Sequence, residues 1–364
     1  MSVTLTIIIA VFIFFIIIVV HELGHYLAAR IFKMRVYEFS LGMGPRFFKR
    51  KLKNDTIFAL KVFPIGGSVQ LGEDMEDNGD PDSFKNKPVW QRMIVILAGA
   101  FLNLVLGLIA CFILVGIGGE VPTRVISSFT KDAVSNEKLM VGDEIIKINN
   151  LTIHSPVYDI GYSMSNSKSG PSVDFLVRRN GKEILLENVS FASKENDRGG
   201  YEITRDFFVF SETVGFSNIF RESFGQMFSM SRLIVMSIKD IISGAYGLNS
   251  FSGPVGIVNV IEQSVTSAIE AGRTVEEGIF FAFSNGLNLF ALITINVGIF
   301  NLLPIPALDG ARFIFFCVEA VRRRPIKAEV EGAIHFAGFA LLMLFMLVVT
   351  FNDIRKLLFG GGII

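Results

Sequence analysis

Four long apolar segments limit what this chain can fold into more strongly than any other feature of the sequence. Residues 3–31, 89–116, 285–318 and 333–351 each hold enough apolar side chains to cross a hydrocarbon core of about 30 Å as a helix rising about 1.5 Å per residue. Hydrophobic residues make up 51% of the 364 residues, and the excess over a typical soluble protein lies in these segments. The sequence therefore predicts a polytopic α-helical membrane protein with about four transmembrane helices.

Charge and cysteine content exclude several other classes. The formal net charge is zero, so no overall basic field indicates a nucleic-acid partner. The two cysteines, Cys111 and Cys317, both lie in apolar stretches, which argues against a disulfide framework or a cysteine-based metal site. The N-terminus shows no basic region and no small-residue cleavage site, so we expect the first apolar segment to be retained as a membrane helix.

The distribution of lysine and arginine predicts the orientation, because loops rich in these residues face the cytoplasm. Basic residues cluster in the loop after the first apolar segment and again at 322–327, between the third and fourth. A first helix that runs from outside to inside satisfies both clusters and places the long middle region outside the cytoplasm. Arg355 and Lys356 near the C-terminus oppose this assignment, because they would also lie outside.

The regions between the apolar segments have other patterns. Residues 38–72 contain short β-segments separated by Gly-Pro and Gly-Gly, and residues 121–203 hold alternating strands such as VDFLVRR and KEILLE around turn signals. Apolar residues then recur at helical spacing, which predicts an amphipathic helix on the membrane or beneath the soluble region. The recurring residues are Phe216, Phe220, Phe224, Met227 and Phe228.

The strongest chemical signal follows the first apolar run, in the sequence His21-Glu22-Leu-Gly-His25. Two histidines four residues apart share one face of a helix, which suits two imidazoles on one zinc ion. Glu22 would flank the metal and can take a proton from metal-bound water. Ionisable groups at the end of an apolar helix are costly unless they are paired or functional, and two of the four histidines of the chain lie in this motif.

A catalytic zinc site needs a third protein ligand, and the residues alone leave three candidates at membrane depth: Asp309, Glu319 and His335. Asp309 follows the segment NLLPIPALDG, in which two prolines interrupt the third apolar run. Irregular backbone at this depth is tolerated where protein or a watery cavity covers it, so the interruption indicates a functional position. Asn296 and Asn301 precede it, where their amides would contact backbone or substrate, or join helices.

Several longer passages resemble the site-2 proteases, in particular the bacterial regulator-of-sigma-E protease (RseP) type. They are HELGHYLAARIF, EFSLGMGP, FPIGGSVQLGE, AGAFLNLVLG, SGPVGI and INVGIFNLLPIPALDG, which occur in the order found in that family. The resemblance implies one catalytic Zn²⁺ held by His21, His25 and Asp309, with Glu22 as the general base. It also implies support of the substrate or transition state by four residues, Asn301, Asn296, Gly66 and Gly67.

The resemblance also implies a domain organisation. Residues 1–118 would form a first membrane half containing a re-entrant β-loop at 38–72, which presents an extended edge to a substrate strand. The stretch LMVGDEIIKINNLTI is similar to the core of a PDZ domain, so residues 119–206 would form a single inserted PDZ-like domain of α+β structure. An amphipathic linker at 207–283 and a second membrane half at 284–364 would follow.

The function implied is that of a zinc-dependent intramembrane endopeptidase, in which Glu22 assists the attack of zinc-bound water. Its substrates would be transmembrane segments of single-pass proteins, such as pre-cleaved anti-sigma factors or remnant signal peptides. We expect a multi-pass protein of the bacterial cytoplasmic membrane, with the active site towards the cytoplasm and the PDZ-like domain outside, where it would bind a peptide or protein ligand. Two alternatives are an inactive membrane scaffold and a metal transporter, whose ionisable groups would be spread along a path rather than gathered at one depth.

Overall fold

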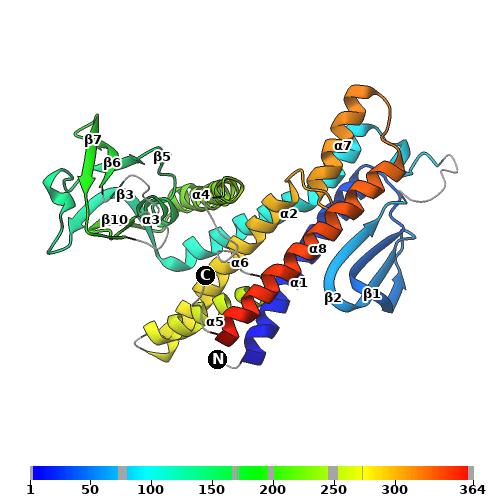
Figure 1. Cartoon of the computed structure of the whole chain (residues 1–364), viewed down its shortest axis with the longest axis horizontal. Coiled ribbons are helices and arrows are strands. Elements are labelled where there is room, and N and C mark those ends of the chain that lie inside the picture. The colour runs from blue at the N-terminus through cyan, green and yellow to red at the C-terminus, as the bar shows by residue number, and fades with distance from the viewer. Residues whose placement is uncertain are drawn as a thin grey trace. The chain divides into compact units, whose positions relative to one another are not determined.

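The computed structural model describes residues 3–72, 80–165, 170, 172–195, 201–244, 253–272 and 274–359. The chain divides into two compact units, one made of Met1–Gly107 and Ile234–Ile364 and the other of Leu108–Leu233. The first unit contains α1 (Val3–Ile31), most of α2 (Val89–Gly118), α5 (Pro254–Ala271), α6 (Val275–Asn301), α7 (Asp309–Arg322) and α8 (Ala328–Phe359). The order of these helices along the chain can be followed in Figure 1.

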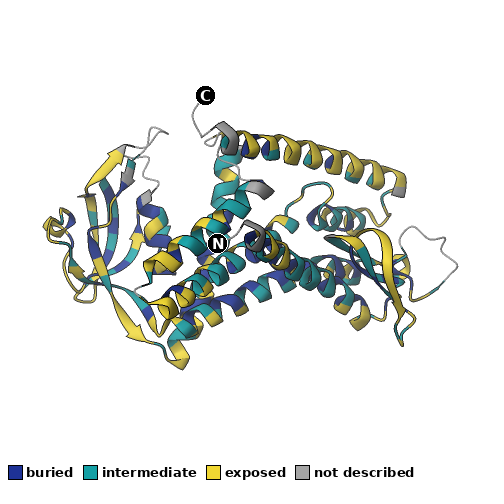
Figure 2. Cartoon of the chain, turned by 90° about the horizontal axis from the view of Figure 1, so that it is seen from below, coloured by how far each residue is buried: buried dark blue, intermediate teal, exposed yellow. Residues whose placement is uncertain are grey.

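Four helices are long and apolar enough to cross a membrane, which confirms the predicted number. These helices contain the candidate spans Thr6–Ile31, Val89–Gly118, Val275–Asn301 and Glu329–Lys356. Only 11% of the most apolar window of α8 is buried within the protein, and Figure 2 shows exposed residues along much of this helix. A large exposed apolar surface of this kind is expected where lipid is the solvent.

The third membrane helix ends earlier than the sequence predicted. The apolar run 285–318 was expected to form one interrupted span, whereas α6 occupies Val275–Asn301 and α7 begins as a separate helix at Asp309. The helix α6 starts where the Thr274 side chain accepts a hydrogen bond from the backbone N–H of Glu277. It stops before Pro304 and Pro306, because proline has no N–H to continue the ladder of hydrogen bonds.

Two long strands, β1 (Glu38–Lys51) and β2 (Ile57–Gln70), both bend, so that each contributes two arms to a small sheet. Residues 38–41 pair with 57–60 on one side and with 67–70 on the other side, while residues 46–51 pair with 57–61. The arm 67–70 is therefore an outer arm, and within the described part of the chain no strand pairs with its free side. The strand β2 contacts α1, which places this sheet beside the first membrane helix.

The C-terminal helix α8 also holds the start of α5. Asp353, which is 4% exposed, accepts hydrogen bonds of 2.8 Å from the backbone N–H groups of Gly253 and Gly256. A carboxylate at a helix N-terminus satisfies amides that lack a partner in the helix and interacts favourably with its dipole. Asp353 near the end of α8 therefore caps the beginning of α5 at Gly253 and Gly256.

The second unit is built on a sheet in the order β10-β3-β4-β6-β7, with β5 paired to β4. These strands are β3 (Glu120–Phe129), β4 (Glu144–Ile148), β5 (Leu151–Thr152), β6 (Ser172–Arg179), β7 (Lys182–Ser190) and β10 (Phe207–Thr213). A separate pair is formed by β8 (Ser193–Glu195) and β9 (Tyr201–Ile203), and the helices are α3 (Pro156–Ser165) and most of α4 (Phe216–Ile242). Buried Ile126, Ile145, Phe175 and Phe207 belong to its apolar core.

A buried polar network joins α3 to α4 within this unit. Asp159 is fully buried and forms an ion pair of 2.7 Å with Arg232 and a hydrogen bond of 2.8 Å from the Ser229 hydroxyl. Glu222 is 3% exposed and accepts hydrogen bonds from Ser155 and from the next turn of α4. The opposite face of α4 exposes Phe216, Phe220, Phe224 and Phe228, as predicted for an amphipathic helix.

Candidate metal centre

The three residues of the HExxH motif lie on α1, as their spacing predicted. His21 and His25 are one helical turn apart, and their rings meet edge to face with centroids 4.8 Å apart. His25 is buried, while His21 and Glu22 are partly buried. Because the turn of α1 that carries them packs against α2, the two imidazoles point into the protein rather than into lipid.

Asp309, the first residue of α7, joins these histidines. Its Oδ2 lies 3.1 Å from Nε2 of His21 and 3.3 Å from Nε2 of His25, and the two Nε2 atoms are 3.2 Å apart. Four-coordinate zinc with bonds of about 2.0–2.1 Å holds its ligand atoms about 3.3 Å from one another. The three atoms therefore form a triangle of the size that one face of a zinc tetrahedron requires.

The chemistry of the three atoms also fits a cation. Nδ1 of His25 lies 2.8 Å from the carbonyl oxygen of Val95 and must carry a proton to bond it, which leaves a lone pair on Nε2 of the neutral ring. The buried Oδ2 of Asp309 accepts no hydrogen bond from any described residue. Lone pairs that converge without a donor between them repel one another, and a metal ion placed among them removes this repulsion.

The close approach of α2 makes this arrangement possible. A Cβ atom on Gly99 would lie 2.4 Å from Nε2 of His25 and 2.8 Å from Cε1 of His21, both closer than real side chains allow. Only glycine therefore permits α2 to pass this close to the two imidazoles. The HExxH motif on α1 does not indicate Gly99, because the role of this glycine arises from the crossing of α1 and α2.

Asn103, one turn further along α2, orients the other histidine. Its amide nitrogen lies 3.5 Å from Nδ1 of His21, and the Thr294 hydroxyl donates a hydrogen bond of 3.2 Å to its backbone carbonyl. If Nε2 of His21 binds metal, Nδ1 carries the proton and requires an acceptor, which the amide oxygen of Asn103 provides once the amide is turned over. That oxygen is fully buried and otherwise has no partner among the described residues. The signal in the sequence was a lone amide within the apolar run AGAFLNLVLG.

The two other candidates for the third ligand have different partners. Glu319 receives hydrogen bonds of 3.1 and 2.6 Å from the two terminal nitrogens of the Arg92 guanidinium. His335 accepts the backbone N–H of Ala307 on its Nδ1, at 3.0 Å. Asp309 is therefore the candidate that geometry brings to the histidines, and within the described residues these three form the one group of His, Cys, Asp or Glu that could hold a metal ion.

The sheet of β1 and β2 also approaches the metal-binding residues, at Glu22. A Cβ atom on Gly67 would lie 2.6 Å from Cγ of Glu22, so this arm of β2 passes directly over the glutamate next to the metal ligands. Gly66 has a φ of +78° and packs against Met43 instead. The glycine at 67 thus allows the backbone of an outer strand to approach Glu22 without a side chain between them.

Asn296 and Asn301 lie on the last two turns of α6. The Oδ1 atom of Asn296 is buried and has no hydrogen-bond partner among the described residues. Asn301 is partly buried at the end of the helix, just before the turn that leads to Asp309. Within the described part of the chain, neither amide hydrogen-bonds a residue of the metal-binding group.

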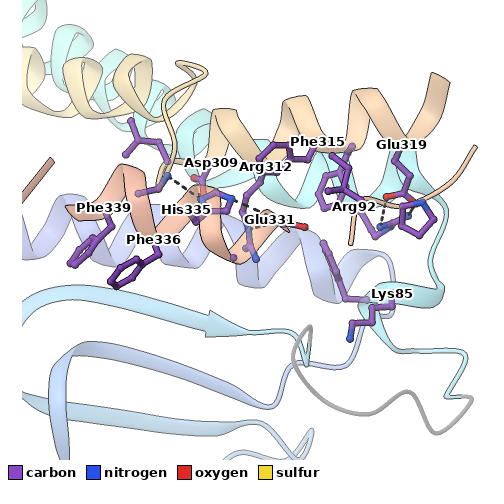
Figure 3. A pocket seen from close by; sticks show the side chains of 17 residues that line it. Lys85, Arg92, Asp309, Arg312, Phe315, Glu319, Glu331, His335, Phe336 and Phe339 are labelled. Atoms are coloured by element: carbon purple, nitrogen blue, oxygen red, sulfur yellow. Dashed lines mark hydrogen bonds and ion pairs between the residues drawn. The ribbon is translucent and has the colours of Figure 1, made fainter. Parts of the chain in front are cut away.

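A cavity of about 800 Å³ adjoins the centre, and Asp309 forms part of its wall (Figure 3). Aromatic side chains of α7 and α8 line it together with the Arg92–Glu319 pair and with Arg312 and Glu331, which form an ion pair of 3.8 Å. Asp309 therefore borders a space that is both apolar and charged, large enough for several side chains of another molecule.

Comparison with known proteins supports the chemistry of this site. The sequence model of peptidase family M50 matches residues 9–345. A protein of Fusobacterium nucleatum that is provisionally named a zinc metalloprotease is 33% identical over 97% of this chain and 99% of its own length. The zinc metalloprotease RasP of Geobacillus kaustophilus is 28% identical over 92% of this chain and 94% of its own. The regulator of sigma-W protease RasP of Bacillus subtilis is 27% identical over 97% of this chain and 99% of its own length.

Proposed function

Since the chain belongs to peptidase family M50 and is a zinc metalloendopeptidase of the site-2 protease type, we propose that it cleaves transmembrane segments of single-pass membrane proteins. The observation that carries this proposal is the triangle of His21, His25 and Asp309 ligand atoms next to Glu22, at the end of a helix able to cross a membrane. A catalytic group in that position acts on peptide bonds that a soluble protease does not reach. Family membership also favours hydrolysis over the scaffold and transporter alternatives.

The protein residues have distinct tasks in this reaction. When bound by the three ligands, zinc supplies a Lewis acid that polarises the scissile carbonyl and acidifies a water molecule. Glu22, next to the ligand atoms, would take a proton from the attacking water and pass it to the leaving nitrogen. His25 is held in the metal-binding tautomer by the carbonyl of Val95, and His21 by the amide of Asn103.

The substrate must be extended when it is cut, because a helix hides its peptide bonds within its own hydrogen bonds. The outer arm 67–70 of β2 offers a free strand edge beside Glu22, to which an unwound segment can add as a further strand. Backbone hydrogen bonds along this arm would fix the scissile bond relative to the metal. Asn296 and Asn301 would then support the substrate or the developing charge from the end of α6.

The membrane orientation follows from the basic loops. We place the loop after α1 and the basic segment 322–327 in the cytoplasm, which puts the metal centre near the cytoplasmic end of α1. Water would then reach the site from the cytoplasm. Residues 119–206 would form a PDZ-like domain outside, where it acts as a size filter or docking module for substrates that another protease has already trimmed. The name of the Bacillus subtilis relative, regulator of sigma-W protease, supports a regulator of a sigma factor as the substrate class.

The experiment that tests the proposal is cleavage of a reporter transmembrane substrate by the purified full-length protein. We expect wild-type protein to cleave it, a zinc chelator to abolish cleavage, and Glu22→Gln to bind zinc normally without cleaving. Full activity of Glu22→Gln, or activity unaffected by the chelator, would rule the proposal out. A soluble peptide of the same sequence provides the control that separates intramembrane cleavage from general proteolysis.

A further inference from the structure

The turn that precedes Asp309 contains a residue in an unfavourable backbone conformation. The carbonyl of Ile305 accepts a hydrogen bond of 3.1 Å from the N–H of Leu308, with Pro306 and Ala307 between them. Ala307 has a φ of +79°, in the left-handed region. Proline followed by a residue of positive φ is the pattern of a type II turn, whose second central position favours glycine or asparagine. An alanine there needs support from elsewhere in the structure.

That support comes from α8. In such a turn the N–H of the second central residue is not used within the turn, and here Ala307 donates it to Nδ1 of His335 at 3.0 Å (Figure 3). The His335 ring packs edge-on against Phe315 of α7 with centroids 5.5 Å apart, and its Nε2 lies 4.0 Å from Oε1 of Glu331. The imidazole is therefore held by its packing against Phe315, with its Nδ1 lone pair directed at the turn.

The same face of α8 contacts the preceding residue of the turn. Gly338 follows His335 by three residues and is buried against Pro306, because a Cβ atom on it would lie 2.2 Å from the Cβ atom of Pro306. Residues three apart on a helix share a face, so His335 and Gly338 together hold both central residues of the turn.

Asp309 depends on this turn for its position. Its Oδ2 lies within 3.3 Å of Nε2 of both imidazoles, but this oxygen has no hydrogen-bond partner among the described residues. The approach of Oδ2 to the imidazoles therefore depends on where the turn places the backbone of Asp309, the first residue of α7 and two residues after Ala307.

We propose that His335 is a positioning residue for the metal centre. By accepting the N–H of Ala307, it holds the left-handed turn in the form that brings Oδ2 of Asp309 to the two imidazoles. His335 itself is not one of the three residues whose ligand atoms converge. This inference rests on the proposed assignment of Asp309 as the third zinc ligand.

The test measures zinc affinity of the full-length protein by competition with a chelator, so that it does not depend on cleavage. We expect His335→Leu to lower the affinity about 10- to 100-fold, the usual effect of losing a group that orients a ligand. His335→Gln offers an amide oxygen as acceptor and should stay close to wild type. Adding Ala307→Gly to His335→Leu should restore affinity, because glycine adopts the left-handed conformation without support. Ile334→Ala, at the adjacent exposed position of α8, is the matched control and should bind zinc normally.

A second readout is the visible spectrum of the Co²⁺-loaded protein, which reports the number and geometry of ligands. His335→Leu should change this spectrum, whereas a variant that only destabilises α8 should not. Equal losses in His335→Leu and His335→Gln without recovery by Ala307→Gly would overturn the inference. If His335→Leu does not fold, the double variant with Ala307→Gly decides: tight zinc binding supports the inference and weak binding overturns it.

Asp309→Asn separates this inference from the assignment on which it rests. If Asp309→Asn weakens zinc binding and folded His335→Leu does not, the positioning role is wrong and the ligand assignment stands. If Asp309→Asn leaves zinc binding unchanged, the ligand assignment itself fails, and the positioning role fails with it.

Discussion

Replacing Gly99 by alanine should disable the metal centre with a single methyl group. The added Cβ atom would lie 2.4 Å from Nε2 of His25, whereas ordinary contacts begin at 3.4 Å. The helix or the imidazole must therefore move by about 1 Å, several times the tolerance of about 0.2 Å for a zinc–ligand distance. A change of this size should reduce zinc affinity at least about 100-fold, or about 2.7 kcal/mol.

Gly107→Ala is the matched control for this substitution. It lies on the same helix, about 12 Å further along, and its Cβ atom would meet Cγ1 of Ile295 at the same 2.4 Å. Both variants should lose about 1–3 kcal/mol of stability through overpacking, but Gly107→Ala should bind zinc as wild type does.

The assay is chelator competition on purified protein, combined with thermal unfolding of the metal-free form. The unfolding midpoints should fall in both variants, and the zinc affinity should fall only in Gly99→Ala. Wild-type zinc affinity in Gly99→Ala would refute the reasoning, because two imidazoles on that face of α1 leave no room for the methyl group. An equal loss of affinity in Gly107→Ala would show that helix packing in general controls the site.

Three further substitutions test other parts of the molecule. Asn103→Leu removes the acceptor for His21 and should lower zinc affinity about tenfold, so an unchanged affinity in the chelator assay would exclude this role. Glu319→Gln leaves Arg92 without its carboxylate and should cost about 2 kcal/mol of stability in thermal unfolding, while zinc content stays at the wild-type level; loss of zinc would return Glu319 to the ligand candidates. Burial raises the pKa of the Glu222 carboxyl above its ordinary value of 4.5, so the folded protein retains the proton where the unfolded chain has released it. The stability should therefore fall as the pH rises from about 4.5 to the folded-state pKa, and Glu222→Gln should remove this fall in unfolding midpoints measured across that range.

Local patterns in the sequence were sufficient for one part of the site. The spacing of His21 and His25 fixes both on one helical face, because that follows from the helix period alone. The third ligand was not fixed in this way, since Asp309, Glu319 and His335 all lie near the same depth in the sequence pattern. The choice among them depends on Arg92, which is 227 residues from Glu319 in the chain and pairs with it. Such a pairing is a property of the packed helices and has no local signature.

The end of the third membrane helix shows a second limit of sequence reasoning. Apolar residues continue on both sides of the prolines, so a count of hydropathy predicts one long span. The backbone instead follows the hydrogen bonds, which stop where Pro304 and Pro306 offer no N–H. The prolines predicted the interruption itself, but the apolar pattern did not show that α6 ends at Asn301 or that a separate helix begins at Asp309.

The break in the third apolar run also explains how a carboxylate is kept charged beside two imidazoles. If the helix continued through residues 302–308, Asp309 would lie within a helix and would lack the unsatisfied amides of a helix end. The turn makes Asp309 the first residue of α7, where the helix dipole favours negative charge. An ionised carboxylate is the form that binds a metal cation. The turn therefore contributes twice, by aiming Oδ2 at the histidines and by placing the carboxylate where its charge is stabilised.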